Sequence, residues 1–308
     1  MKLPEELQLA IDGIATHSTH LRKAREALTL NYRAGKNSPF ADEATRLAYL
    51  GARMPATYAA IYKVLENLPY SPTHLLDLGA GPGTASWAAV NAFSDLKKIT
   101  LIEKHSQAIA LGKKLIQSSS NPVLNQAEWI CQSVEEKIPS ADTAIASYVL
   151  NELVDPLALV ERVWKEVSTL IVIEPGTPKG YQLINKIRTK LISLNAHLIA
   201  PCPHSLKCPI EGTDWCHFSA RVERTRLHRL LKEGSLGHED EKFSYLIATK
   251  IKNEIGSCSR ILRHPQKQSG FTRLTLCTPD GTIKEETVSK KDKEIYRKAR
   301  KAEWGDAW

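Results

Sequence analysis

The chain has 308 residues, of which 42% are hydrophobic and 25% charged, and its formal net charge is +8. Ordinary apolar content with charges of both signs excludes an intrinsically disordered chain, and the length suits one large core with small appendages. No run of 18 apolar residues occurs, so we expect no transmembrane helix and no membrane partner.

The first residues, MKLPEELQLA, contain two early glutamates and lack the apolar region of a secretory signal. An Arg-rich, acid-poor transit peptide is not visible either. The six cysteines of such a chain indicate metal ligands or catalytic groups before disulfides. We therefore expect a cytoplasmic protein in a reducing environment.

Predicted elements begin with a helical region over residues 1–68. The stretch ADEATRLAYLGARMPATYAAIYKVLENL places apolar residues at steps of three and four, and Pro55 is expected to kink or divide this helix. Residues 69–200 alternate predicted strands (HLLDLGA, KITLIEK, EWICQSV, DTAIASYVL and STLIVIEPG) with predicted helices. Strands separated by helices predict right-handed crossovers and a mostly parallel sheet of the α/β class.

Residues 201–240 break this alternation, because they are rich in Cys, Pro, His and Arg, and they are predicted to form an insertion. In residues 241–288, KFSYLIATK and FTRLTLCTPDG are predicted to be two strands that pair antiparallel and close the sheet. Residues 289–308 are predicted to be a basic, helical tail. Residues 250–308 hold 14 Lys and Arg against 8 Asp and Glu, an asymmetry that favours an anionic partner such as nucleic acid.

The segment DLGAGPGT, residues 77–84, leaves a predicted strand and enters a predicted helix. Its glycines permit a tight turn and a close backbone approach to a ligand, and the N–H groups of the following helix point toward that ligand. A carboxylate 20 residues after the last glycine, at the end of the next strand, suits the hydroxyls of a ribose. The predicted cofactor site consists of Asp77, Gly79, Gly81, Gly83 and Glu103.

Dinucleotide-binding loops favour G-x-G-x-x-G, whereas this loop is G-x-G-x-G. The leading Asp and the compact glycines resemble motif I of class I S-adenosylmethionine-dependent methyltransferases. In that family the first acidic residue contacts the methionine end of the cofactor and the second binds the ribose. The resemblance implies these roles for Asp77 and Glu103, and a dinucleotide-binding enzyme is the alternative.

The acceptor of a methyl group is harder to read from the sequence. The fourth predicted strand runs into SYVLNEL, where enzymes that methylate amino groups often carry Asn/Asp-Pro-Pro-Tyr/Phe. That motif is absent, and no catalytic cysteine of the pyrimidine C5 type is evident. Tyr148 and Asn151 are equally well explained by packing beside the cofactor, so the catalytic residues are unknown.

Cys202, Cys208 and Cys216 have the spacing C-x5-C-x7-C, which lets three thiols converge on one metal. The fourth ligand must come from elsewhere, and Cys277 on the last predicted strand could complete the set. The spacing leaves zinc and iron–sulfur open, because four thiolates suit either metal. The flanking histidines at 204 and 217 could substitute in a zinc site, although such residues more often lie behind the ligands. Cys131 and Cys258 are expected to be buried small hydrophobic residues.

Four long segments carry a family resemblance: PCPH…CP…DWCHFSARVERTRLHR, HEDEKFSYLIATK, SRILRHP…SGFTRLTLCTPDG and KKDKEIYRKARKAEWGD. They resemble the small-ribosomal-subunit methyltransferase-like family, which includes bacterial members and the mitochondrial ribosome assembly factor. The resemblance covers most of the chain after residue 42 and is densest over 198–308. It implies a class I methyltransferase fold, S-adenosylmethionine as cofactor, action on the small ribosomal subunit during assembly, and a structural 4Fe-4S cluster. The cluster ligands that it implies are Cys202, Cys208, Cys216 and Cys277.

Clustered cations support an rRNA partner, because Lys and Arg neutralise phosphates. A solvated charged face is the alternative. Three functions are left open: an active rRNA methyltransferase, a non-catalytic cofactor-binding assembly factor, and a small-molecule methyltransferase with a zinc site. No DNA partner is expected. The predicted rRNA contacts are Arg221, Arg224, Arg226, Arg229, Lys290, Lys291, Arg297 and Arg300.

Overall fold

In the computed structural model, the described residues are 1–16, 23, 42–232, 237–252 and 258–308. The chain forms two units: Met1–Ser147 with Ala220–Glu241, and Tyr148–Ser219 with Lys242–Trp308. Across the described residues, no helix is both long enough and apolar enough to cross a membrane.

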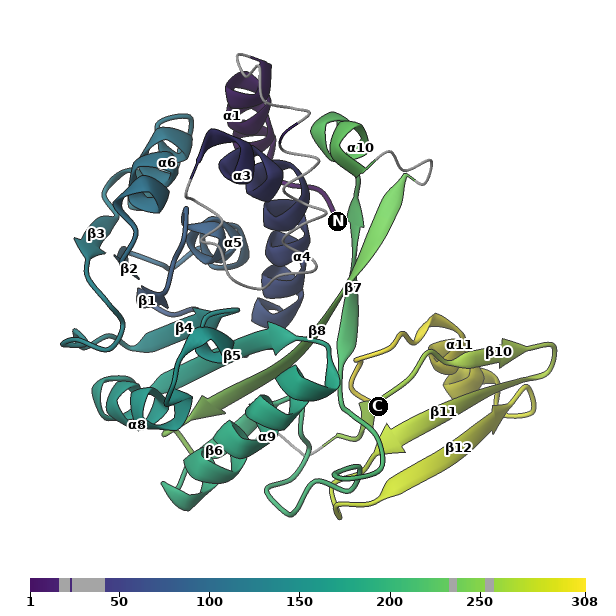
Figure 1. The fold of residues 1–308 in the computed structure, drawn as a ribbon. Helices are drawn as coiled ribbons and strands as arrows, with labels where there is room; N and C mark the ends of the chain where they lie inside the picture. Colours follow the sequence, from purple (N-terminus) through teal and green to yellow (C-terminus); the bar gives the residue numbers. More distant parts are fainter. Residues whose placement is uncertain (17–22, 24–41, 233–236, 253–257) are drawn as a thin grey trace. The chain divides into compact units, whose positions relative to one another are not determined.

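The first unit contains four parallel strands in the order β3-β2-β1-β4 (Figure 1). They are β1 (His74–Leu78), β2 (Lys98–Glu103), β3 (Glu128–Cys131) and β4 (Thr143–Ser147). The register of β1 with β2 pairs Leu78 with Ile102, so the carboxyl ends of the two strands meet at one edge. This edge therefore brings together the glycine loop that follows β1 and Glu103 at the end of β2.

The crossovers of this unit are helices. α5 (Thr84–Ala92) connects β1 to β2, whereas α6 (Ser106–Ile116) and the short α7 (Pro122–Asn125) connect β2 to β3. Parallel strands require such crossovers, since a short turn cannot return the chain to the same end of the sheet. The predicted α/β class with a parallel sheet is confirmed.

The N-terminal region is helical where it is described: α1 (Glu5–Thr16), α3 (Glu43–Ala48) and α4 (Met54–Leu65). A π-helical turn, Tyr49–Arg53, joins α3 to α4 without a break, and Pro55 is the second residue of α4. We expected Pro55 to kink or divide this helix. In the structure, a π-helical turn lies just before Pro55 and separates α3 from α4. Residues 17–22 and 24–41 of the predicted helical region lie outside the described residues.

The predicted insertion, 201–240, is divided between the two units. Its second half contains α10 (Arg226–Lys232), between β7 (Phe218–Glu223) and β8 (His238–Thr249). α10 packs against the π-helical turn at Gly51, where an added Cβ would lie 2.4 Å from Leu231 Cδ1 and 2.7 Å from Leu227 Cγ. A side chain at this position would force the two helices apart.

The second unit holds two groups of antiparallel strands. In the first, β8 lies between β5 (Thr169–Pro175) and β6 (His197–Ala200). α8 (Pro156–Glu166) precedes β5, and α9 (Pro178–Ser193) follows it. α9 starts close to β5, because a Cβ at Gly180 would lie 2.0 Å from the carbonyl oxygen of Pro175.

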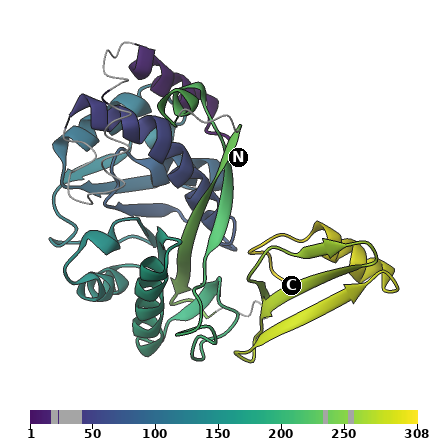
Figure 2. The same ribbon diagram turned by 45° about the vertical axis from the view of Figure 1, so that its right-hand side comes forward.

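The second group is a four-stranded sheet made of β9 (Arg260–Ile261), β10 (Gln266–Gln268), β11 (Phe271–Cys277) and β12 (Ile283–Ser289) (Figure 2). The prediction that KFSYLIATK and FTRLTLCTPDG pair with each other is wrong. The first belongs to β8, which pairs with β5 and β6, and the second belongs to β11, which pairs with β9, β10 and β12. Both are apolar strands, and apolar character does not select the partner of a strand.

The C-terminal segment is packed rather than extended as a tail. α11 (Lys293–Lys301) follows β12; Ala299 on this helix is buried, and so are Ala302 and Trp304, which follow it in the chain. A β-bridge between Arg260 and Ala307 ties the end of the chain to β9. The basic residues of α11 are therefore held on a folded support.

Candidate cofactor loop and cysteine pocket

The glycine loop after β1 has the geometry of a backbone that approaches a ligand. Gly79, Gly81 and Gly83 have φ values of 65°, 55° and 85°, in the left-handed region that residues with side chains avoid. The N–H of Gly81 donates to Glu103 Oε2 at 2.9 Å, and the N–H of His105 donates to Glu103 Oε1 at 2.8 Å. Both carboxylate oxygens keep lone pairs for a further donor.

Asp77 at the end of β1 is fully buried. Its Oδ2 accepts a hydrogen bond from Ser86 Oγ at 2.9 Å, whereas its Oδ1 has no hydrogen-bond partner among the described residues. Burial raises the pKa of Asp77 to about 7. Buried polar atoms normally have a partner, so this oxygen is a place where a donor from a ligand or a water would be accepted.

Tyr49 reaches the cofactor loop from the π-helical turn. Its hydroxyl lies 3.2 Å from Thr84 Oγ1, at the first residue of α5. Burial raises the pKa of Tyr49, so the phenol stays protonated and can donate. Nothing in the sequence pattern singled out this residue, because π-helical turns have no reliable sequence signature.

The segment that follows β4 is held by a buried carboxylate. Glu174 on β5 accepts hydrogen bonds from the N–H of Leu150 at 3.0 Å and from Asn151 Nδ2 at 2.5 Å. Burial raises the pKa of Glu174 to about 7. Tyr148 has φ of 59°, a conformation that costs free energy for a residue with a side chain. The side chain of Asn151 is thus hydrogen-bonded to Glu174. These contacts assign no catalytic role to either Asn151 or Tyr148.

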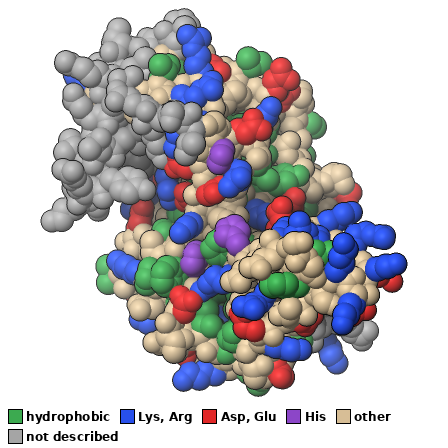
Figure 3. Space-filling view, turned by 90° about the vertical axis from the view of Figure 1, so that its right-hand side faces the viewer, with side chains coloured by type: hydrophobic (Ala, Val, Ile, Leu, Met, Phe, Trp, Pro, Cys, Tyr) green, Lys and Arg blue, Asp and Glu red, His purple; other side chains and the backbone are tan. Residues whose placement is uncertain are grey.

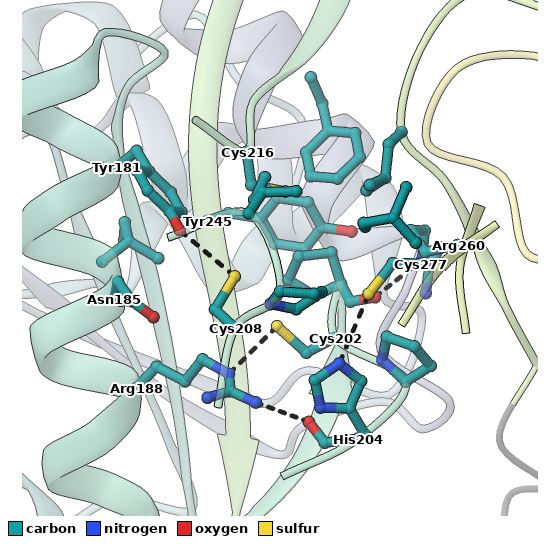
Figure 4. Close-up of a pocket in the computed structure, with 18 residues that line it drawn as sticks. Tyr181, Asn185, Arg188, Cys202, His204, Cys208, Cys216, Tyr245, Arg260 and Cys277 are labelled. Atoms are coloured by element: carbon teal, nitrogen blue, oxygen red, sulfur yellow. Dashed lines mark hydrogen bonds between the residues drawn. The ribbon is translucent and has the colours of Figure 1, made fainter. Parts of the chain in front are cut away.

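The four cysteines predicted as metal ligands line one cavity of about 40 Å³ in the second unit (Figure 4). This volume exceeds the roughly 10–15 Å³ that a single water molecule needs. Cys202, Cys208 and Cys216 come from the loop between β6 and β7, and Cys277 comes from the end of β11. The structure therefore brings together all four residues, although they lie on two segments that are far apart in sequence.

Helix α9 supplies two hydrogen-bond donors to the sulfurs of this pocket. Arg188 Nε donates to Cys202 Sγ at 3.3 Å, and the hydroxyl of Tyr181 donates to Cys208 Sγ at 3.2 Å (Figure 4). His204 Nε2 lies 3.5 Å from Cys277 Sγ. Three of the four sulfurs thus have a polar side chain within reach of a hydrogen bond.

Three thiols of the pocket, those of Cys202, Cys216 and Cys277, have pKa values above that of an ordinary cysteine. Burial raises the pKa of Cys202, against the opposing effect of nearby Arg188. Burial and the neighbouring cysteines raise the pKa of Cys216 well above its ordinary value and that of Cys277 to about 12. A metal that binds here must displace thiol protons, so its affinity depends on pH.

Other candidate ligands are placed differently. Within the described parts of the chain, no three or more His, Cys, Asp or Glu side chains come close enough to hold a single metal ion. His217 stacks on Trp215 and lies edge-on to Trp304, which makes it part of an aromatic cluster. Cys131 and Cys258 are exposed, so the expectation that both are buried is wrong. Cys131 ends an edge strand and Cys258 precedes β9, and neither position is covered.

The predicted rRNA-binding arginines after the third cysteine fall into two groups. Arg221 makes two hydrogen bonds to Asp240 at 2.8 and 3.0 Å, and Arg224 pairs with Glu239 at 3.4 Å. These acids lie on β8, far from the arginines in sequence, so the pairing was not foreseen. Arg226 and Arg229 are exposed on α10.

The predicted rRNA-binding residues of the C-terminus are all exposed: Lys290, Lys291, Arg297 and Arg300. Figure 3 shows Lys and Arg side chains gathered on the face formed by the C-terminal sheet and its helix. Because α11 is supported by buried Ala299 and Ala302, this surface holds its charges in a defined arrangement.

Sequence reasoning missed Arg188 and Tyr181, which touch the cysteine sulfurs. A signal for them exists in the helix PKGYQLINKIRTKLIS. Tyr181, Ile184 and Arg188 stand at steps of three and four on its buried face. An arginine on an apolar face needs a partner in the interior, and this is the pattern that could have found it.

Comparison with known proteins supports the family resemblance. The family described as "Mitochondrial small ribosomal subunit Rsm22" matches residues 43–308. The chain is 25% identical over 292 residues to the human ribosome assembly protein METTL17, mitochondrial, covering 86% of this chain and 62% of that protein. It is 27% identical over 340 residues to Rsm22-cox11 tandem protein 1, mitochondrial, of Schizosaccharomyces pombe, covering 88% of this chain and 45% of that protein. The chain thus spans less than two thirds of the length of these relatives.

Solved methyltransferase structures are also similar. One is precorrin-6y C5,15-methyltransferase from Geobacter metallireducens, with TM-score 0.43 and 13% identity over 62% of this chain and 88% of that one. Another is the mitomycin 7-O-methyltransferase MmcR, with TM-score 0.42 and 16% identity over 78% of this chain and 73% of that one.

The expected cytoplasmic location is wrong. The matching family and the relatives from human and yeasts all carry mitochondrial names. The expectation rested on the composition of the first residues and on cysteine usage, and neither property distinguishes one reducing compartment from another.

We expect Asp77→Asn to change how stability depends on pH. The pKa of this carboxyl rises from an ordinary value near 3.8 to about 7 on folding, so the folded state binds the proton more tightly than the unfolded state. Its contribution to the free energy of unfolding is full below pH ~4 and is lost as the pH rises through about 7. Asn does not titrate, so urea unfolding at several pH values across this window should show a smaller decline for the variant. Equal declines in the two proteins would contradict this assignment.

Proposed function

Because this chain belongs to the Rsm22 family of mitochondrial small ribosomal subunit proteins, we propose that it is an S-adenosylmethionine-binding, methyltransferase-like protein that binds small-subunit rRNA during ribosome assembly. We further propose that it carries a structural 4Fe-4S cluster. The observation that carries the proposal is the convergence of four cysteines, from two distant segments of the family-matched region, on one cavity.

The cofactor part of the proposal is supported by the loop after β1. Three glycines in the left-handed region bring the backbone close to a ligand, and Glu103 has lone pairs available for ribose hydroxyls. The unpaired Oδ1 of Asp77 would accept a donor from the methionine end or from a water beside it. S-adenosylmethionine, when bound, supplies an activated methyl group. The proposal is limited to binding, because Asn151 is committed to Glu174 and no side chain is assigned to the transfer.

The metal part is supported by the charge of the pocket. Arg188 is 4% exposed, and among the described residues it has no carboxylate partner. A buried cation without a counter-ion is unfavourable, and four thiolates on a metal centre carry the negative charge that would balance it. The four sulfurs, the cavity and Arg188 therefore fit an anionic metal–thiolate group.

A 4Fe-4S cluster and a zinc ion place different demands on the four sulfurs. A zinc ion holds its thiolates about 2.3 Å from one point, whereas the thiolates of a 4Fe-4S cluster bind different irons and stay farther apart. The cluster would join the β6–β7 loop to β11 and so contribute to the folding of the second unit.

The rRNA part is supported by the exposed cations of α11 and the turn before it. α11 packs through the buried Ala299, so its exposed cations project from a folded helix toward solvent, where they can neutralise phosphates. Arg226 and Arg229 are candidates for further contacts, whereas Arg221 and Arg224 have acidic partners within the fold.

Glu103→Ala should weaken binding of S-adenosylmethionine by roughly ten- to a hundredfold, because each hydrogen bond to a charged group is worth about 1.5–3 kcal/mol. Calorimetric titration of the purified protein measures this. Glu128→Ala is the matched control, since that glutamate is exposed on the neighbouring strand and pairs with Lys98. Absence of binding to the folded wild-type protein would refute the cofactor assignment.

Cys277→Ser should remove most of the bound metal, whereas Cys258→Ser should leave it unchanged. Cys277 lines the pocket, and Cys258 is exposed and outside its lining. Protein purified without oxygen should be brown and contain iron and acid-labile sulfide in equal amounts. Colourless protein with one zinc per chain would disprove the cluster but keep the site, and metal loss in Cys258→Ser alone would disprove the choice of fourth ligand.

Replacing Lys290, Lys291, Arg297 and Arg300 with Gln should weaken binding to small-subunit rRNA. The slope of log K against log[salt] should become shallower by about 0.7–0.9 for each phosphate that the protein no longer neutralises. The control replaces Lys97, Lys113, Lys114 and Lys137 with Gln, which removes the same charge from exposed positions of the first unit. Equal weakening in the C-terminal variant and in the control would mean that only the net charge of the protein matters. An unchanged salt-dependence slope in the C-terminal variant would refute an rRNA-binding surface on α11.

A further inference from the structure

One face of α9 borders the cysteine pocket. Tyr181, Ile184 and Arg188 all line the cavity, and they follow one another at steps of three and four residues. The helix is held in place at its start, because Thr177 caps it through the N–H of Gly180 and Gly180 packs against the carbonyl of Pro175. The positions of the Tyr181 and Arg188 side chains are therefore set by a firmly anchored element.

Arg188 is the buried cation of this face. Its Nε donates to Cys202 Sγ, while one terminal nitrogen donates to the carbonyl oxygens of His204 at 2.8 Å and Leu206 at 2.6 Å. Figure 4 shows the guanidinium directed at the loop that carries the cysteines. These contacts orient the guanidinium but do not neutralise it, because carbonyl groups carry no net charge.

The positive charge of Arg188 would attract a negatively charged metal–thiolate centre in this cavity. Four thiolates around a metal centre leave net negative charge in a cavity with a mostly apolar lining, where charge interactions are stronger than in bulk solvent. A guanidinium is always protonated, so its positive charge is present at every working pH. Arg188 Nε lies 3.3 Å from Cys202 Sγ, so this charge stands directly beside one of the proposed ligands.

We propose that Arg188, assisted by the hydroxyl of Tyr181, is the residue that holds the anionic metal–thiolate centre in this pocket by balancing its charge and donating to its sulfurs. The proposal rests on the proposed function in that it takes the four cysteines as the metal ligands. Arg188 acts through the sulfurs and is a positioning residue. Tyr181 makes the corresponding contact to Cys208 from one side of the cavity.

A purely structural role makes a different prediction. If Arg188 only braced the His204 and Leu206 carbonyls, Lys and Gln at this position would be equally harmful, because neither reproduces the guanidinium fork. If its charge matters, Arg188→Lys should restore much of what Arg188→Gln loses. Lys186→Gln is the matched control, since it removes one positive charge from an exposed position on the same helix.

The test uses the full chain, purified without oxygen with the metal it carries, and first records metal content and folding by circular dichroism. Release of the metal to excess EDTA is then followed over time. Arg188→Gln should release it at least tenfold faster than wild type, Arg188→Lys should lie near wild type, and Lys186→Gln should match wild type. Tyr181→Phe, which removes one donor without a cavity, should be severalfold faster and covers the case in which Arg188→Gln does not fold.

A second readout applies when the metal is iron–sulfur. Removing a positive charge beside the cluster disfavours its more negative, reduced form, so Arg188→Gln should lower the one-electron reduction equilibrium constant about tenfold, which is ~59 mV. Arg188→Lys should keep the potential close to that of wild type. A loss of packing alone would not produce a shift that a lysine reverses.

The outcomes separate the two proposals. Metal-loaded wild type with equal release rates in Arg188→Gln and Lys186→Gln overturns the role of Arg188 and leaves the metal site standing. Equal acceleration in Arg188→Gln and Arg188→Lys, with unchanged potential, reduces Arg188 to a brace of the loop and also overturns the proposal. Wild type without any metal removes the metal part of the proposed function, and this inference with it.

Discussion

The convergence of four thiols on a single cavity, which the side chains of Arg188 and Arg260 also line, is the constraint that links the segments of the second unit. Thiols with raised pKa values do not repel one another while they are protonated, but they also do not attract. Arg188 brings a charge into the same space without a carboxylate beside it among the described residues. A metal centre bound by the thiolates would supply negative charge beside Arg188 and would cross-link the β6–β7 loop to β11.

The first unit obeys a simpler rule. Parallel pairing of β1 with β2 puts their carboxyl ends at one edge, and this brings the glycine loop within hydrogen-bond distance of Glu103. Asp77, Glu103 and the left-handed glycines all follow from this register. The hydroxyl of Tyr49, in the π-helical turn, also reaches the start of α5 beside this loop. The alternation of strands and helices in the sequence did not predict this contact.

Much of the fold could be predicted from the sequence, because strand and helix periodicity are local properties. The glycine loop, its flanking strand and helix, and Glu103 were found for that reason. Strand partners were not, since KFSYLIATK and FTRLTLCTPDG are both apolar and each accepts several neighbours. Arg221 and Arg224 looked available for phosphates only because their acids, Asp240 and Glu239, come from a different strand.

The sequence by itself determined the alternation of strands and helices from β1 to β5, the glycine loop after β1 and the set of cysteines worth considering, because spacing and local turn chemistry encode these. Only the tertiary structure decided that Cys277 reaches the pocket from a separate sheet, that Arg188 and Tyr181 touch its sulfurs, and that the C-terminal cations stand on a packed helix. The physical reason is that these relations join residues far apart in the chain, and such contacts depend on packing between elements rather than on any local pattern.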